Sequence, residues 1–174
     1  IYEKLLKPNE AIKNYNQAIN MDGNKIDLIY RLGMALYNQG QLKESLEYLR
    51  RYIISNAQDL DVLIILGKTL SDLNRIPEAI DIYKKLIDFN PGNTEYYYNI
   101  AKLYWDFNDY NKAQYYYSMI LEFNQTDGEI FYYLGFIANQ NLEYELAKNY
   151  LFYALECGFV SIDLYEQLSL SHIK

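Results

Sequence analysis

Small residues recur along this chain at a fixed spacing of 34 positions, within segments whose apolar residues follow a helical period. Two series of small residues keep the same phase: Gly33, Gly67, Ala101, Gly135 and Ser169, and Ala11, Ser45, Ala79, Ala113 and Ala147. Large aliphatic residues keep the same step at Leu32, Leu66, Ile100, Leu134 and Leu168. Self-similarity at a fixed period indicates a stacked array of units.

Each unit contains two segments whose apolar residues fall on one helical face. In residues 60–93 the first face carries Leu63, Leu66, Gly67 and Leu70, and the second carries Ala79, Ile82, Tyr83 and Leu86. Residues 74–77 predict a short turn that places Pro77 in the first turn of the second helix, where its missing N–H costs nothing. Asn90-Pro91-Gly92-Asn93 predicts the end of that helix.

The phase divides residues 1–174 into a single array. It predicts a partial repeat at 1–25, complete repeats at 26–59, 60–93, 94–127 and 128–161, and a partial repeat at 162–174. The sequence is expected to begin and end inside a first helix. Because neither end carries the polar capping helix that arrays need for solubility, we expect it to be a piece of a longer protein.

The small residues of the first series sit in mid-helix, where glycine costs about 1 kcal/mol relative to alanine. That cost is explained if another helix crosses there at close range. The small residues of the second helices would face the same contact. Tyr15, Tyr83 and Tyr117, each four residues after a small residue, are expected to pack around the crossing.

These spacings resemble the tetratricopeptide repeat, a 34-residue helix–turn–helix unit. In repeat 94–127 the residues that carry the resemblance are Tyr97, Ile100, Ala101, Tyr104, Ala113 and Tyr117. The resemblance implies an all-α, right-handed solenoid of stacked repeats, with the first helices lining a concave groove and the second helices forming the outer wall. A 35-residue RNA-reading helical repeat is a near alternative, but the strict spacing of 34 and the acidity of the chain argue against it.

The groove implied by the resemblance supplies the candidate partner-binding residues. They lie at recurring positions of the first helices: Tyr30, Met34, Tyr37, Lys68, Glu95, Tyr98, Asn99, Lys102, Trp105, Glu129, Tyr132, Tyr133, Phe136 and Asn139. Trp105 is the best single candidate for an anchor, because aromatic residues dominate binding energy at interfaces. The alternative is that Trp105 and several tyrosines only fill the junctions between helices.

The net charge of −7 arises in the second half of the chain. Residues 1–93 hold 12 basic and 12 acidic side chains, whereas residues 94–174 hold 4 basic and 11 acidic ones and 21 of the 29 aromatic residues. Acidic charge repels phosphate, so nucleic acid and anionic membranes are poor partners. A protein or peptide with basic and apolar residues is the favoured partner.

An acidic residue recurs at the start of each first helix: Asp27, Asp61, Glu95, Glu129 and Asp163. Such residues interact favourably with the helix dipole, which is one interpretation; a negative rim that attracts basic side chains is the other. Some tetratricopeptide domains clamp the terminal carboxylate of chaperones with Lys at this position and Arg four residues later. Because the position is acidic throughout, we do not expect this clamp here.

Groups for catalysis are scarce. His172 is the only histidine, and no His/Cys cluster with metal-ligand spacing or phosphate-binding glycine loop is present. Cys157 is expected to be a buried filler residue, and a single cysteine leaves the compartment undecided. We therefore expect no catalytic residues, no metal and no cofactor within this sequence.

The leading hypothesis is a non-catalytic scaffold that binds a peptide or protein segment in its groove, mainly over residues 94–140. The sequence leaves two alternatives open. The array could be the substrate-recognition or regulatory arm of a larger enzyme, such as a glycosyltransferase, or an element of self-association.

Overall fold

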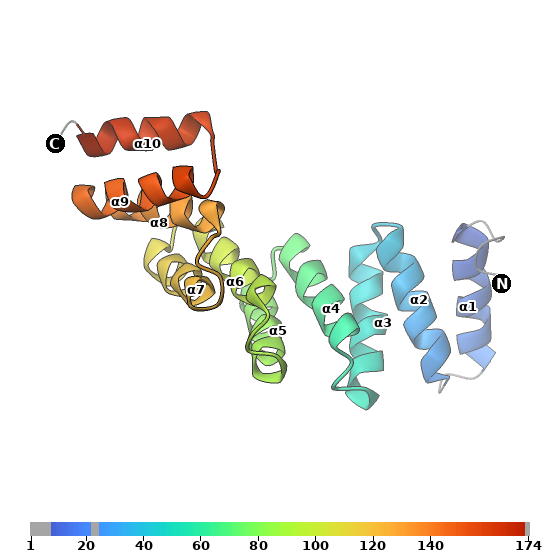
Figure 1. Ribbon diagram of the computed structural model, residues 1–174. Helices are drawn as coiled ribbons and strands as arrows, with labels where there is room; N and C mark the ends of the chain where they lie inside the picture. The colour runs from blue at the N-terminus through green and yellow to red at the C-terminus, as the bar shows by residue number, and fades with distance from the viewer. Residues whose placement is uncertain (1–7, 22–24, 173–174) are drawn as a thin grey trace. The chain divides into compact units, whose positions relative to one another are not determined.

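Helices make up the whole of the regular secondary structure in the part of the chain that the computed structural model describes, residues 8–21 and 25–172 (Figure 1). In chain order they are α1 (Pro8–Met21), α2 (Ile26–Asn38), α3 (Leu42–Ser55), α4 (Leu60–Asp72), α5 (Ile76–Phe89), α6 (Thr94–Asp106), α7 (Tyr110–Phe123), α8 (Gly128–Gln140), α9 (Tyr144–Glu156) and α10 (Ile162–His172). Each complete predicted repeat contains two helices. The expectation that the sequence begins inside a first helix falls on residues 1–7, outside the described residues.

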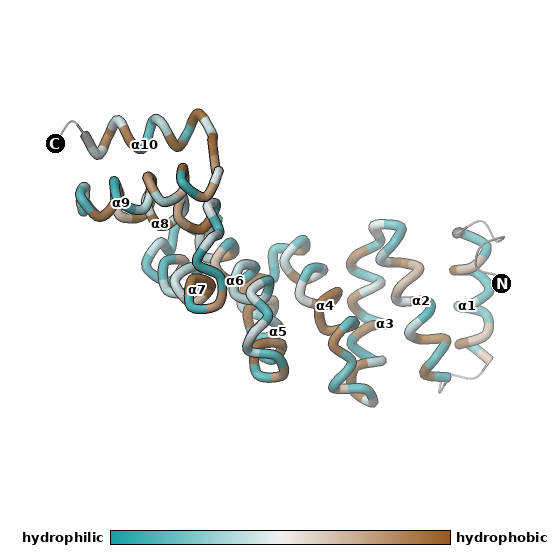
Figure 2. Tube along the Cα trace, viewed as in Figure 1, coloured by the Kyte–Doolittle hydropathy of each residue, from teal (hydrophilic) through white to brown (hydrophobic). Residues whose placement is uncertain are grey.

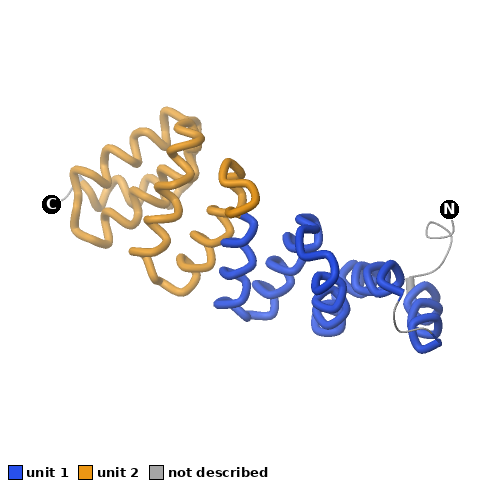
Figure 3. Tube along the Cα trace, turned by 90° about the horizontal axis from the view of Figure 1, so that it is seen from below, with its two compact units in different colours: residues 1–86 blue, residues 87–174 orange. Residues whose placement is uncertain are grey.

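The chain divides into two compact units, residues 1–86 and residues 87–174, with the boundary inside α5 (Figure 3). In the first unit α2 packs against α1 and α3, and α3 packs against α4. In the second unit α6 pairs with α7, α8 pairs with α9, and α10 contacts both α8 and α9. Within each unit, these helices that follow one another in sequence are also packed neighbours, as expected for a repeat array.

The turns between paired helices also recur every 34 residues. Residues at equivalent positions have positive φ: Gly40 (71°), Asn74 (58°), Asn108 (56°) and Leu142 (64°). In each turn the following N–H donates to a carbonyl five residues earlier, as Arg75 N does to Leu70 O and Glu143 N does to Ala138 O. This is the Schellman ending of a helix, which favours Gly or Asn, so Leu142 is strained.

Four of the first helices also begin alike, whereas Lys25 at the start of α2 makes no side-chain cap. The side chains of Asp59, Asn93 and Asp127 accept hydrogen bonds from backbone N–H groups of the first turns of α4, α6 and α8. Ser161 does the same for Leu164 N in α10. These four caps lie 34 residues apart and supply acceptors that the first turn of a helix otherwise lacks.

The predicted close approach at the small residues is confirmed, and its partner is a side chain of the paired helix. A Cβ added to Gly33 would lie 2.7 Å from Leu49 Cδ2, and one added to Gly135 would lie 2.7 Å from Leu151 Cγ. A Cβ added to Gly67 would lie 2.9 Å from Cζ of Tyr83. Glycine is used here because these large side chains occupy the space of its missing methyl group.

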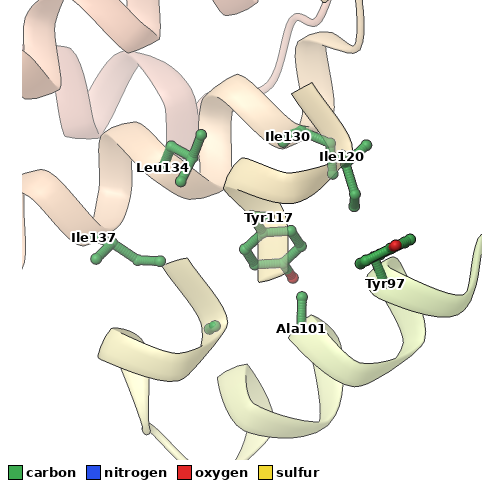
Figure 4. Packing of buried hydrophobic residues seen from close by; sticks show 8 residues of the cluster. Tyr97, Ala101, Tyr117, Ile120, Ile130, Leu134 and Ile137 are labelled. Atoms are coloured by element: carbon green, nitrogen blue, oxygen red, sulfur yellow. The ribbon is translucent and has the colours of Figure 1, made fainter. Parts of the chain in front are cut away.

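Apolar and polar residues alternate along the helices (Figure 2), and the apolar ones form the buried faces. In the second unit one core gathers residues of α6, α7 and α8 around Tyr117, whose ring lies beside Ala101 of α6 (Figure 4). A second core joins Leu151 and Ala154 of α9 to Leu164 and Leu168 of α10. The first unit has an aliphatic core at Ile19, Ile29, Leu32 and Leu36. The prediction of an all-α solenoid of stacked helix–turn–helix repeats is confirmed.

Candidate partner-binding surface

Six aromatic side chains of α6, α7 and α8 form a continuous group in the second unit. We call this group the aromatic cluster: Tyr98, Trp105, Tyr110, Tyr117, Tyr133 and Phe136. The ring of Trp105 lies 4.8 Å from the rings of both Tyr133 and Phe136, centroid to centroid. Tyr133 in turn stacks on Tyr117, with ring planes 5° apart. Tilted and stacked contacts at these distances are favourable beyond the area that they bury.

The aromatic cluster is partly open to solvent. Tyr117 is buried, while Tyr98, Trp105, Tyr133 and Phe136 are half-buried. Tyr132, also half-buried, extends the row of rings through contacts with Tyr133 and with Phe159. The rings therefore fill helix junctions, as the alternative interpretation of Trp105 held, and also present surface. Both roles coexist in the same residues.

Glu129 lies at the edge of this cluster, in the first turn of α8. Its Oε1 accepts hydrogen bonds from the hydroxyl of Tyr98 at 3.2 Å and from the hydroxyl of Tyr133 at 3.1 Å. Burial and the charge of Glu129 raise the pKa of Tyr98. Burial and the neighbouring Tyr98 and Glu129 raise the pKa of Tyr133 as well. Both hydroxyls therefore stay neutral donors to the carboxylate at ordinary pH.

Two polar groups near the cluster have no hydrogen-bond partner. They are the hydroxyl of Tyr117 and the side-chain nitrogen of Asn99, both inaccessible to solvent. Burial raises the pKa of Tyr117, so its hydroxyl keeps its proton. An unpaired buried hydroxyl costs about 1–3 kcal/mol.

The prediction that Asn139 belongs to the partner-binding surface is wrong. Asn139 is only 7% exposed, and its side-chain nitrogen donates to the backbone oxygen of Gln167 at 2.9 Å and to the side-chain oxygen of Gln167 at 3.1 Å. The residue therefore ties α8 to α10. The sequence pattern placed it one turn beyond Phe136 without showing that α10 would cover it.

The candidate residues of the first unit lie apart from any comparable aromatic group. Tyr30, Met34, Tyr37 and Lys68 are half-buried. The ring of Tyr30 contacts that of Tyr52, whose hydroxyl donates to Asp59, and this hydrogen bond raises the pKa of Tyr52 to about 12. The structure thus brings together the candidates Tyr98, Trp105, Glu129, Tyr133 and Phe136.

The remaining expectations have mixed outcomes. Glu95 and Lys102 are exposed on α6, as a surface role requires. Cys157 is exposed at the C-terminal cap of α9, so the expectation of a buried filler is wrong. Three residues that contact the candidate residues were not predicted from the sequence: Tyr110, Phe159 and Gln167. Tyr110 could have been found from the 34-residue step, which aligns it with the apolar Leu42 and Ile76.

Two further features are absent from the part of the chain that the structure describes. No group of three or more His, Cys, Asp or Glu side chains there is placed to hold a metal ion. No helix there is long and apolar enough to cross a membrane.

Known structures share this fold. The chain aligns with MamA AMB-1 at a TM-score of 0.73 and 19% identity, covering 91% of this chain and 87% of that one. It aligns with residues 41 to the end of MamA from Desulfovibrio magneticus RS-1 at a TM-score of 0.71 and 17% identity, covering 86% and 85%. YrrB, described as a TPR protein with an unusual peptide-binding site, aligns at 0.68 and 17% identity, covering 95% and 82%.

Family models match most of the sequence, although no curated protein does. Residues 6–86 match the model for subunit 3 of the anaphase-promoting complex, cyclosome. Residues 67–106 match a TPR repeat model, and residues 94–127 match a tetratricopeptide repeat model. The last match coincides with the predicted repeat at 94–127, and the chain is a tetratricopeptide repeat protein.

Proposed function

We propose that this chain is a protein-interaction module that binds a peptide or protein segment over the first helices of the second unit, α6 and α8. Tyr98, Trp105, Tyr132 and Phe136 would bury the apolar or aromatic anchors of the partner. Glu95 and Glu129 would lie beside its basic residues. The binding surface is non-catalytic, and the partner is a protein.

The observation that carries this proposal is the partial exposure of the aromatic cluster. Large rings that are held rigidly and remain half open to solvent are the usual anchors of protein interfaces. Their mutual contacts fix the rings before a partner arrives, so that little side-chain entropy is lost on binding.

Charge supports the same surface. Residues 94–174 carry 11 acidic and 4 basic side chains, which favours a basic segment and speeds its encounter with the protein. Most of the affinity is assigned to the rings, because exposed ion pairs contribute about 0–1 kcal/mol.

A peptide selection followed by paired variants tests the proposal. Random 12-residue peptides displayed on phage are selected on the purified chain, and their affinities are measured by fluorescence anisotropy. Trp105→Ala is expected to weaken binding by at least about 1 kcal/mol. Phe107→Ala, which removes an exposed ring two residues away that lies outside the aromatic cluster, is the matched control and is expected to change nothing. Equal binding to wild type and Trp105→Ala would remove Trp105 from the surface.

A further inference from the structure

The acidic residue at the start of each first helix has a different neighbour in different repeats. In α2, Asp27 is paired with Arg31 four residues later, through Nε at 2.8 Å. In α8, the equivalent residues are Glu129 and Tyr133, exactly three repeats further along the chain. A neutral tyrosine thus stands where the first complete repeat has its own arginine.

The charge of Glu129 is left without a cation as a result. In the described part of the chain its carboxylate is held by two neutral hydroxyls, those of Tyr98 and Tyr133, and both bind the same oxygen, Oε1. The second oxygen, Oε2, has no hydrogen bond from either. A half-buried carboxylate that is oriented but not neutralised has both the position and the charge to accept a cation.

The rings around Glu129 suit the same kind of ligand. Tyr98 and Tyr133 carry electron-rich faces, and a cation near an aromatic face gains a further attraction. Tyr117, which stacks on Tyr133, has a buried hydroxyl with no partner among the described residues.

We infer that Glu129, framed by Tyr98 and Tyr133, is the binding site for one cationic side chain of the partner, and that a guanidinium group fits it as Arg31 fits Asp27. This inference rests on the proposed function and narrows it, since it gives the partner one basic residue at a defined place beside the apolar anchors. Glu95, the equivalent residue of α6, is exposed, whereas Glu129 is half-buried.

The test compares two small probes that differ in charge but hardly in shape. N-acetyl-arginine amide and its neutral isostere N-acetyl-citrulline amide are titrated into the isotopically labelled 174-residue chain, and the amide shifts of α8 are followed by NMR. The wild type is expected to bind the arginine probe at least about threefold more tightly than the citrulline probe. Glu129→Gln, which keeps an acceptor oxygen for the two tyrosines, is expected to abolish this preference.

Two further variants are based on the Asp27–Arg31 ion pair of α2. Tyr133→Arg supplies the missing guanidinium from the chain and is expected to occupy the site, so that the preference for arginine disappears. Asp27→Asn, at a carboxylate that already has its arginine, is the matched control and is expected to leave the preference unchanged.

The outcomes separate this inference from the proposed function. Equal binding of the two probes by the wild type, or an undiminished preference in Glu129→Gln, would overturn the cation site. If the selected peptides then still depended on Trp105, the proposed binding surface would stand without it. Should Tyr133→Arg fail to fold, the result for Glu129→Gln decides the question.

Discussion

The two units use the same repeat to build different surfaces. In the first unit the groove positions of α4 are Ile64, Ile65 and Lys68, and the acidic residue of α2 is neutralised by Arg31. In the second unit the equivalent positions of α8 carry Tyr132, Tyr133 and Phe136, and the carboxylate of Glu129 accepts hydrogen bonds from two tyrosine hydroxyls. Caps, turns and close contacts are shared, so the surface can vary while the scaffold stays constant.

This comparison is the physical reason for proposing a binding surface in the second unit. The residues that hold a repeat together are small, aliphatic or buried, and they recur every 34 positions in both units. Groove residues carry no such constraint. Where they become aromatic and lie beside an acidic residue, the repeat acquires a surface that can recognise a partner.

The first prediction tests whether the same buried ring contributes equally to the stability of both units. Tyr83 and Tyr117 occupy equivalent positions, and both are fully buried. Replacing either by alanine is expected to lower the free energy of unfolding by about 3–5 kcal/mol, because the loss of a large buried ring leaves a cavity. Urea denaturation followed by circular dichroism measures both. A cost below about 1 kcal/mol at one position only would show that the repeats do not share this packing.

The second prediction concerns a place where the second unit departs from the shared turn. Leu142 has a φ of 64° and is 67% exposed, whereas the equivalent residues are Gly40, Asn74 and Asn108. Leu142→Gly is expected to stabilise the chain by about 1 kcal/mol, since the left-handed conformation costs other residues about 1–2 kcal/mol. Thermal unfolding measures the gain. The reverse change, Gly40→Leu, is expected to destabilise, and a stabilising result there would refute the argument.

The smallest effect is expected from pH in the first unit. The hydrogen bond to Asp59 raises the pKa of Tyr52 to about 12, so the folded chain keeps a proton that the unfolded chain loses near pH 10. The contribution of Tyr52 is therefore present below about pH 10 and is lost as the pH rises toward about 12. Urea midpoints measured from pH 9 upward should fall less steeply for Tyr52→Phe than for the wild type. Parallel slopes would mean that the hydrogen bond does not form.

The fold could be predicted well from the sequence because residues close in sequence determine the helices, turns and close contacts of each repeat. A small residue such as Gly67 and its step of 34 residues predict a close contact, and the contact with Tyr83 is present. Pro77 and the stop at residues 90–93 likewise predicted the limits of α5 correctly.

The binding surface was harder to predict because it depends on contacts between repeats. Asn139 shares a helix face with Phe136, but α10 covers it through Gln167, which no period reveals. The hydrogen bond that the Tyr98 hydroxyl donates to Glu129 joins residues of two repeats, and only positions in space show that no described residue places a cation at this carboxylate. Exposure at a helix end, as for Cys157, is also decided by what packs nearby.

Amide hydrogen exchange of the chain, with and without a saturating selected peptide, tests most directly whether the second unit carries recognition. The account predicts slower exchange in α6 and α8 and unchanged exchange in α2 and α4. Protection confined to α2 and α4, or protection of neither pair of helices, would contradict it.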